Sequence, residues 1–294
     1  MADKRLLGVF AHPDDESFGP GGTMARYAAE GEVHLLCGTR GEVGEVAEHL
    51  LEGYASIADL RTQELECAVG HLGVQQLDYL GYRDSGMPGT ETSRHPDCLA
   101  QADVAKVAGQ IVAHIRCFKP QVIVTFDQFG GYGHPDHIAI HQATVLAFNA
   151  AGDPARYPDA GETYRPQKLY YHSFSKTIMR AMVRVMPLFG RDPSKFGRNG
   201  DIDLREIAEW DVPTTTRIDI RPWYAQRTAA AACHESQGGG VGMWRGIPRS
   251  VQRRMLGFET FFRAVPTFPK GAPPEKDLFA GVFLGENMGE RTRG

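Results

Sequence analysis

The chain has 294 residues, of which 42% are hydrophobic and 23% charged, and its formal net charge is −4. This length suggests one large domain or two small ones, with a buried core of ordinary composition. The mildly acidic balance gives no support for a nucleic-acid or anionic-membrane partner, which would favour a basic surface. No run approaches the roughly 18 to 20 apolar residues that cross a bilayer, and no secretory h-region follows the N-terminus, so we expect a cytoplasmic protein.

The first half of the chain alternates short apolar segments with longer helical ones. This alternation predicts βαβ units and a Rossmann-like, doubly wound, mostly parallel α/β core over residues 1–172. The Gly-rich stretch at 19–22 lacks the G-x-G-x-x-G order, so nucleotide binding is not supported. The expected strands are 5–11, 33–37, 74–80, 122–126 and 168–171. The expected helices are 21–30, 57–72, 104–118 and 135–149.

The second half, residues 173–294, has weaker patterns. We expect a strand over 216–220 and an Ala-rich helix over 222–233. No linker separates these elements from the core, so we interpret 1–294 as a single domain whose C-terminal portion packs on the core and walls a pocket. The pattern assigns no role to 176–212 or 240–294.

Five cysteines occur at wide spacings, and none forms a C-x-x-C pair. The odd number and the spacing predict neither a disulfide framework nor a zinc-thiolate site. A reducing cytoplasm is the simplest compartment for such a chain.

Two motifs rich in histidine and aspartate follow predicted strands. His12-Pro13-Asp14-Asp15-Glu16 comes after the first strand, and Gly133-His134-Pro135-Asp136-His137 comes a few residues after 122–126. Either motif alone could be a helix cap or a turn. Because the carboxyl ends of parallel strands meet at one edge of a sheet, we expect the two motifs to lie together. Together they supply the residue types of a two-histidine, one-carboxylate metal site.

The same motifs resemble the LmbE-like, or PIG-L, family of N-acetylglucosaminyl deacetylases. The resemblance extends to residues 39–44 (TRGEVG), to Arg61 with Glu64-Leu65, and to 234–237 (HESQ). Segments 82–87 (YRDSGM) and 130–134 (GGYGH) are most similar to the mycothiol-biosynthesis branch, which makes a low-molecular-weight thiol.

The resemblance implies that His12, Asp15 and His137 are metal ligands. It implies that Asp14 is the general base and that His134, with Asp136 behind it, assists the oxyanion or the leaving group. This division fits general chemistry, because three protein ligands leave room for water and a separate base and acid must move protons. The ligand set suits one Zn²⁺ per chain and would also suit Fe²⁺.

Five further residues are candidates for contacts with the substrate, each with a plainer alternative. Tyr132 could donate to the amide oxygen or be a turn aromatic. Arg61 could reach the sugar or its aglycone, or form an i,i+3 surface pair with Glu64. Asp84 could accept from sugar hydroxyls or belong to a turn. Glu42 and His234 could face the pocket, or sit in a Gly-flanked turn and at a helix end.

The sequence therefore predicts a metal-dependent hydrolase that removes the acetyl group of a small N-acetylglucosaminyl conjugate, inositol- or malate-linked. One alternative is an amidase that cuts a larger, mycothiol-conjugate-type amide. Another is a non-catalytic sugar- or metal-binding protein, although such a protein would not need Asp14. The expected partner is the small amino-sugar conjugate, and the oligomeric state is open.

Overall fold

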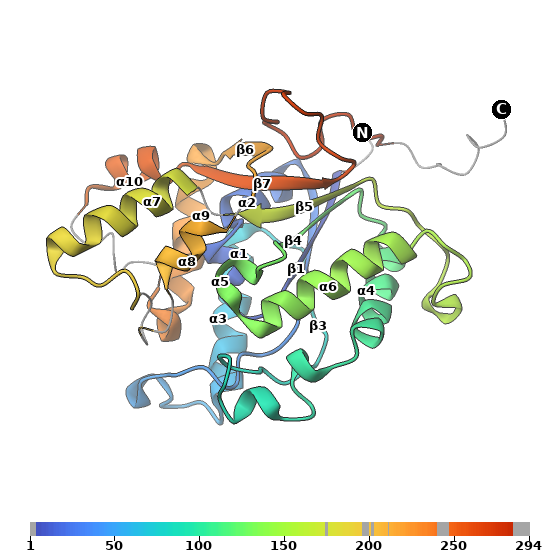
Figure 1. Ribbon diagram of the computed structural model, residues 1–294. Coiled ribbons are helices and arrows are strands. Elements are labelled where there is room, and N and C mark those ends of the chain that lie inside the picture. Colours follow the sequence, from blue (N-terminus) through green and yellow to red (C-terminus); the bar gives the residue numbers. More distant parts are fainter. Residues whose placement is uncertain are drawn as a thin grey trace.

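The computed structural model describes residues 4–173, 176–195, 200, 203–210, 212–239 and 247–284. A seven-stranded sheet forms its centre, in the order β3-β2-β1-β4-β5-β7-β6 (Figure 1). The first five strands in this order are parallel, and β7 runs antiparallel to both β5 and β6. The strands are β1 Lys4–Phe10, β2 Gly31–Cys37, β3 Gln76–Tyr79, β4 Val122–Phe126, β5 Lys168–Ser173, β6 Thr216–Asp219 and β7 Phe258–Val265.

Helices cover both faces of the sheet. Figure 1 shows α4 and α6 side by side across the face toward the viewer, and α2, α3 and α9 pack against one another. The helices are α1 Asp15–Phe18, α2 Gly21–Glu30, α3 Ile57–Leu72, α4 Val104–Phe118, α5 Gly130–Gly133, α6 Pro135–Ala150, α7 Lys176–Val185, α8 Leu204–Glu209, α9 Tyr224–Cys233 and α10 Arg249–Met255. Short 3-10 turns are η1 Glu48–Leu50, η2 Thr92–Arg94, η3 Leu99–Gln101, η4 Pro158–Ala160, η5 Met186–Phe189, η6 Arg221–Trp223 and η7 Glu235–Gln237.

The order of the strands places a topological switch between β1 and β4. The chain moves from β1 outward to β2 and β3, and then crosses to β4 and β5 on the other side of β1. In open α/β sheets, ligands bind beyond the carboxyl ends of the strands at such a point. The loops after β1 and β4 carry the two histidine-aspartate motifs, so the fold brings both motifs to this crevice.

The predicted α/β core is confirmed, with every expected strand present. The expected helices from 21–30 to 222–233 are also present. The sequence analysis missed β7, in which only the first four residues alternate between half-buried and buried positions and which contains two charged residues, Glu259 and Arg263. It also missed α7, α8 and α10, which lie in the basic and Gly-rich stretches of the second half.

Two carboxylates, the buried Glu259 and the half-buried Glu275, tie the C-terminal half to the core. Glu259 of β7 accepts hydrogen bonds from the backbone N–H groups of Gly22 (2.9 Å) and Thr23 (2.8 Å), and so caps the first turn of α2 from 236 residues away. Glu275 accepts from Lys168 Nζ at 3.0 Å and from the Tyr170 hydroxyl at 2.7 Å on β5. The C-terminal half is therefore bonded directly to the central sheet and to helix α2.

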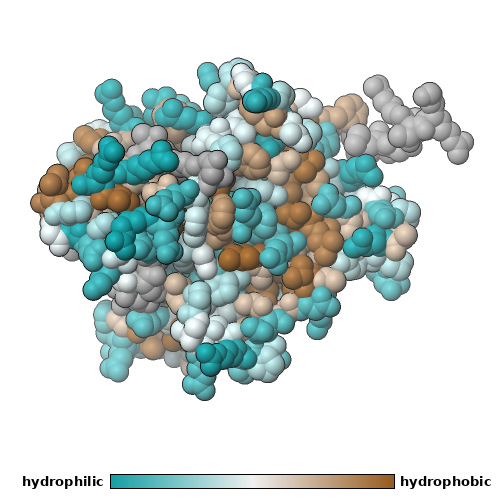
Figure 2. Space-filling model, viewed as in Figure 1, coloured by the Kyte–Doolittle hydropathy of each residue, from teal (hydrophilic) through white to brown (hydrophobic). Residues whose placement is uncertain are grey.

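The surface carries mixed polar and apolar residues. Figure 2 shows brown, apolar atoms at the far left, in the region of α7 and η5. Leu188 and Phe189 of η5 are 81% and 76% exposed. Among the described residues, no helix is long and apolar enough to cross a membrane.

Candidate metal centre

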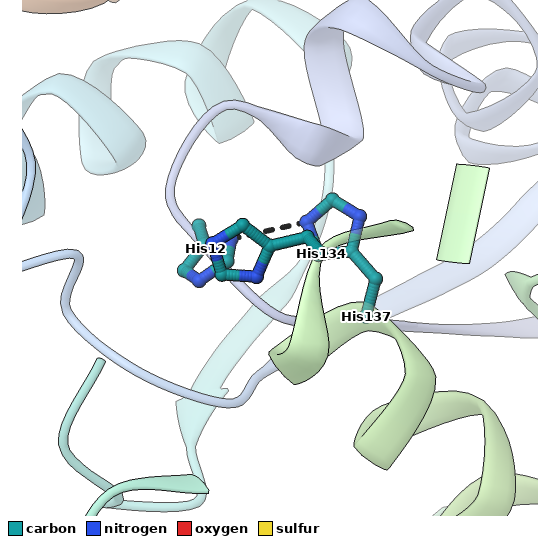
Figure 3. Close-up of side chains that lie close together, drawn as sticks. All are labelled: His12, His134 and His137. Carbon is teal, nitrogen blue, oxygen red and sulfur yellow. Dashed lines mark hydrogen bonds between the residues drawn. The ribbon is translucent and has the colours of Figure 1, made fainter. Parts of the chain in front are cut away.

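Two histidines from different loops meet at the switch point of the sheet. His12 follows β1, His137 lies in the first turn of α6, and both are buried (Figure 3). His12 Nδ1 lies 3.1 Å from His137 Nε2. The ring of His137 stacks on Phe126 at 3.9 Å between centroids, which fixes its plane.

The outer partner of each ring decides which nitrogen carries the proton. His12 Nε2 lies 3.0 Å from Asp136 Oδ2, and a carboxylate only accepts, so this nitrogen donates. His137 Nδ1 lies 3.0 Å from the carbonyl oxygen of Gly130 and donates to it for the same reason. His12 Nδ1 and His137 Nε2 therefore face each other, and they can share one proton or, once that proton has left, bind a cation between them.

The Asp15 carboxylate completes this group. Its Oδ1 lies 3.3 Å from His137 Nε2, and its Oδ2 lies 3.7 Å from His12 Nδ1. Zinc binds such atoms at about 2.0–2.2 Å in a tetrahedron, which requires ligand atoms about 3.3 Å apart. The backbone N–H of His12 donates to Asp15 Oδ2 at 2.8 Å and orients the carboxylate. The three side chains therefore fit a divalent ion of this kind.

Other clusters in the crevice fit a metal less well. His12, His134 and His137 form one such cluster, and His12, His134, Asp84 and Asp136 another. His134 Nδ1 accepts the backbone N–H of Asp136 at 3.2 Å, so a neutral His134 carries its proton on Nε2. Asp136 is fully engaged, because it accepts from His12 and from both the N–H and the hydroxyl of Ser85.

His134 is therefore arranged as a neutral donor beside His12 and His137. Burial, reinforced by the neighbouring His12, lowers the pKa of His134 to about 3. Its ring lies 4.5 Å from that of His12 and 5.0 Å from that of His137. An N–H held at this place can donate to a developing oxyanion.

Asp14 adopts a backbone conformation that is rare for a residue with a side chain. Its φ is 128° and its ψ −27°, and such strain costs about 1–3 kcal/mol and concentrates at functional sites. Arg61 Nη2 donates to Asp14 Oδ2 at 3.2 Å. The Asp14 side chain is 17% exposed, so it remains accessible at the mouth of the buried cluster. Burial raises the pKa of Asp14, against the nearby charge of Arg61.

The predicted roles of four residues change with these contacts. Asp136 backs His12, and its carboxylate forms no hydrogen bond with the His134 ring, which corrects the expected arrangement. Asp84 is buried, with Oδ1 3.5 Å from His12 Nε2, so it contacts the outer nitrogen of a predicted metal ligand. Arg61 is buried and its two terminal nitrogens donate to loop carbonyls, so the surface pair with Glu64 is wrong. His234 is fully buried against Glu16, not at a pocket rim.

Tyr132 and Glu42 keep positions compatible with substrate contact. The Tyr132 ring lies edge-on to His137, with centroids 5.0 Å apart. Glu42 is half-buried and accepts the backbone N–H of Arg40 at 3.2 Å. From the C-terminal portion, Trp210 stacks on Phe129 at 5.0 Å, next to the Gly-rich turn that carries Tyr132.

Comparison with known proteins matches residues 7–148 to the family model PIG-L, described as GlcNAc-PI de-N-acetylase. A 1D-myo-inositol 2-acetamido-2-deoxy-alpha-D-glucopyranoside deacetylase of Thermomonospora curvata is 40% identical over 295 residues, covering 96% of this chain and 97% of that one. One of Thermobispora bispora is 38% identical, covering 97% and 94%. The chain belongs to the PIG-L family. As a PIG-L protein it is a hydrolase that acts on an acetamide, and the alternative of a non-catalytic binding protein falls away.

Other PIG-L relatives and solved structures mark how far the similarity reaches. A mycothiol S-conjugate amidase of Streptomyces coelicolor is 36% identical, covering 96% of this chain and 99% of that one. The N,N'-diacetylchitobiose deacetylase structure from Pyrococcus horikoshii aligns with a TM-score of 0.60 at 19% identity, covering 89% and 84%. The 4-carboxy-2-hydroxymuconate hydratase GalB from Pseudomonas putida aligns at 0.61 and 20% identity, covering 92% and 99%. The two structures establish the fold alone, since one of them serves a different reaction.

The prediction about cysteines is wrong in one respect. Cys67 of α3 and Cys233 at the end of α9 form a disulfide, with Cα atoms 5.9 Å apart. Wide spacing in the sequence hid this pair, because α3 and α9 pack together only in the folded chain. The bond joins the helix that carries Arg61 to the segment that begins with His234.

Several site residues were missed by sequence reasoning. Ser85 holds Asp136 through two hydrogen bonds, and Gly130 supplies the carbonyl that orients His137. Glu16 had been visible only as the last residue of the first motif. Glu64 accepts from the backbone N–H (2.7 Å) and the hydroxyl (2.6 Å) of Ser236, and so joins two motifs that the sequence analysis had noted separately.

Proposed function

We propose that this enzyme is a zinc-dependent cytoplasmic deacetylase of an N-acetylglucosaminyl-inositol conjugate, releasing acetate and the free amine. The observation that carries the proposal is the close approach of His12 Nδ1 and His137 Nε2, with the Asp15 carboxylate beside both. The names of relatives at 36–40% identity over nearly the whole chain support inositol as the aglycone.

In this proposal His12, Asp15 and His137 hold the metal. A divalent ion there would supply Lewis acidity to the amide carbonyl and to the attacking water. The rings are preorganised for this task, because Asp136 and Gly130 already fix their tautomers. The backbone N–H of Ser85 in turn donates to Asp136, so His12 is oriented by Asp136 and Asp136 is oriented by Ser85.

Protons are moved by residues outside the ligand set. Asp14 takes the proton of the attacking water, because its carboxylate is held by Arg61 and stays partly exposed beside the buried histidines. The Nε2–H of His134 donates to the carbonyl oxygen as negative charge develops there, and Tyr132 offers a second donor. The amine leaves with the proton that Asp14 collected, so the sum is addition of one water across the amide bond.

The sugar and its aglycone provide most of the binding energy, because an acetyl group is small. In this proposal Glu42 accepts from sugar hydroxyls, because its side chain is only half-buried and the carbonyl of its neighbour Gly41 bonds to Arg61. Arg61, Asp84 and His234 shape the site from behind and do not contact sugar in this proposal. The C-terminal portion, through Trp210 against Phe129, closes one wall.

The test measures acetate release by purified, zinc-loaded enzyme. Three acetamides are compared at equal concentration: N-acetylglucosaminyl inositol, N-acetylglucosaminyl malate and free N-acetylglucosamine. We expect the inositol conjugate to give the highest kcat/KM and the free sugar the lowest. Faster turnover of the malate conjugate would replace inositol with an anionic aglycone. No acetate from any of the three would remove the proposal.

A second candidate is an amidase that cuts a larger acyl group from the same amino sugar. The S-conjugate amidase relative, at 36% identity and nearly full coverage, favours it almost as strongly as the deacetylases favour the first. A glucosaminyl-inositol amide carrying an S-alkylated N-acetylcysteinyl group discriminates them. If this amide is cleaved with a higher kcat/KM than the acetamide, the amidase function replaces the deacetylase function.

A further inference from the structure

Both polar groups of one peptide unit beside the site are held by side chains from other elements. The carbonyl oxygen of Pro13 accepts Arg61 Nη2 at 2.6 Å. On the other side of the same peptide, the N–H of Asp14 donates to Glu16 Oε2 at 3.0 Å. This peptide enters Asp14, the residue with the strained φ of 128°.

Glu16 is itself held from the C-terminal half. Its Oε1 lies 2.7 Å from His234 Nε2, and neither residue exposes any surface. Ser17 also donates to Oε1. A buried carboxylate that loses its partner is strongly destabilised, so Glu16 depends on His234 for its place. His234 follows Cys233 directly and thus stands at the end of a helix fixed to α3 by the disulfide.

A strained conformation persists only where the surroundings over-determine it. Here the surroundings are Arg61 on one side of the peptide and the Glu16–His234 pair on the other. If the second support were lost, the Asp14 backbone would relax toward an ordinary φ and its carboxylate would move. A displacement of about 1 Å in a reacting group can cost about 10²-fold in rate.

We propose that His234 is a positioning residue, which acts through Glu16 on the Pro13–Asp14 peptide and so aims the Asp14 carboxylate. The inference rests on the proposed function, in which Asp14 is the base. It gives segment 234–237 (HESQ) a role in positioning Asp14, which lies 220 residues earlier in the chain. It also separates His234 from the substrate, since the imidazole is fully covered.

The test replaces His234 with glutamine or asparagine, two amides whose side chains differ in length. In His234→Gln the amide nitrogen takes the place of Nε2 and keeps the bond to Glu16. In His234→Asn it takes the place of Nδ1 and cannot reach Glu16. Glu235→Ala serves as a control, because Glu235 is the exposed neighbour in the same turn. The measurements are kcat, KM, zinc per chain, melting temperature and the metal-free crystal structure of each variant.

We expect His234→Asn to lower kcat about 10- to 100-fold with KM within twofold and zinc retained. His234→Gln should keep at least half of the wild-type kcat, and Glu235→Ala should match wild type. In the crystal structure of His234→Asn the φ of Asp14 should leave the positive region. An unchanged kcat in His234→Asn, a change confined to KM, or loss of zinc would each overturn the inference.

The crystal structures keep this test separate from the proposed function. If the wild-type enzyme releases no acetate, the proposed function fails, yet the Asp14 backbone can still be compared between the Asn and Gln variants. If His234→Asn does not fold, Ser17→Ala, which removes the other donor to Glu16 Oε1, is measured in its place. A positive Asp14 φ in His234→Asn would show that His234 does not hold this loop, and a positive φ in Ser17→Ala would show that the hydrogen bonds of Glu16 Oε1 do not set the Asp14 backbone.

Discussion

Arg61 Nη2 donates to the carbonyl oxygen of Pro13 at 2.6 Å, so helix α3 holds the peptide that enters Asp14. The same guanidinium reaches the carbonyl oxygen of Gly41 at 3.0 Å and the carboxylate of Asp14 at 3.2 Å. A Cβ atom at Gly41 would lie 2.2 Å from Arg61 Nη1, so this position requires glycine. The planar guanidinium of Arg61 thus joins the loop that follows β1 to the loop that follows β2.

Replacement of Arg61 by Lys should therefore cost activity although it keeps the charge. An ammonium cannot make these three bonds in one plane, so Asp14 loses its alignment. We expect kcat to fall about 10-fold or more with KM nearly unchanged. Arg40→Ala, at an exposed arginine that pairs with Asp59 on the same helix, is the control and should match wild type. A rise in KM alone for Arg61→Lys would return Arg61 to the substrate-binding residues.

Metal content should separate the ligands from their neighbours. We expect His137→Ala and Asp15→Ala to lose stoichiometric zinc, and His134→Ala and Asp84→Asn to keep about one ion per chain. Elemental analysis after dialysis measures this, and anaerobic loading with Fe²⁺ tests the other metal that suits the set. Full zinc in His137→Ala, or loss of zinc in His134→Ala, would favour a different cluster.

Asp14 should reveal its role through three substitutions. Asp14→Asn should keep zinc and lose turnover by roughly 10²-fold or more, the scale of general-base loss. Asp14→Gly should be more stable than Asp14→Ala by about 1–3 kcal/mol, because only glycine adopts this φ without strain. Urea unfolding gives the difference. Equal stability of the Gly and Ala variants would mean that the loop relaxes freely, without strain.

Glu275 should contribute to stability in a pH-dependent way. Burial opposes its ionised form, but hydrogen bonds from Tyr170 and Lys168 outweigh burial and lower the pKa of Glu275. Its contribution is therefore present above the unfolded-state pKa and is lost as pH falls through the lower folded-state pKa. Glu275→Gln should cost about 1.5–3 kcal/mol at pH 7, and the difference should shrink toward pH 3. Glu162→Gln, at an exposed pair with Lys119, should leave the unfolding free energy unchanged.

Reduction should lower the melting temperature through the disulfide. The two cysteines are 166 residues apart in the sequence. By restricting the unfolded chain, a disulfide between them raises the free energy of unfolding by up to about 5 kcal/mol in the chain-entropy model. We expect the Cys67→Ser, Cys233→Ser double variant to melt lower than wild type under oxidising conditions and at the same temperature under reducing ones. Cys117→Ser, at an exposed free cysteine, is the control. Equal melting temperatures in both conditions would show that the bond adds no stability.

The sequence was informative where one segment carries both the element and the chemistry. The buried strand before His12 and the β-branched strand before His134 could be read directly, and so the edge of the sheet that collects the two motifs was predictable. The partners of those motifs were not. Ser85 behind Asp136, and His234 behind Glu16, depend on contacts between segments 51 and 218 residues apart. No local pattern encodes such pairs, and a buried arginine looks the same in sequence as an exposed one.

Glu259 has a consequence for any attempt to shorten this protein. The PIG-L family model matches residues 7–148, which include both histidine-aspartate motifs. A fragment trimmed to that match would leave the N–H groups of Gly22 and Thr23 uncapped and would remove β5, the neighbour of β4. We therefore expect a fragment of residues 7–148 to be less stable than the full chain, although it contains both motifs that identify the family. An insertion or truncation near β7, far from the metal in sequence, would act on the helix that follows the first motif.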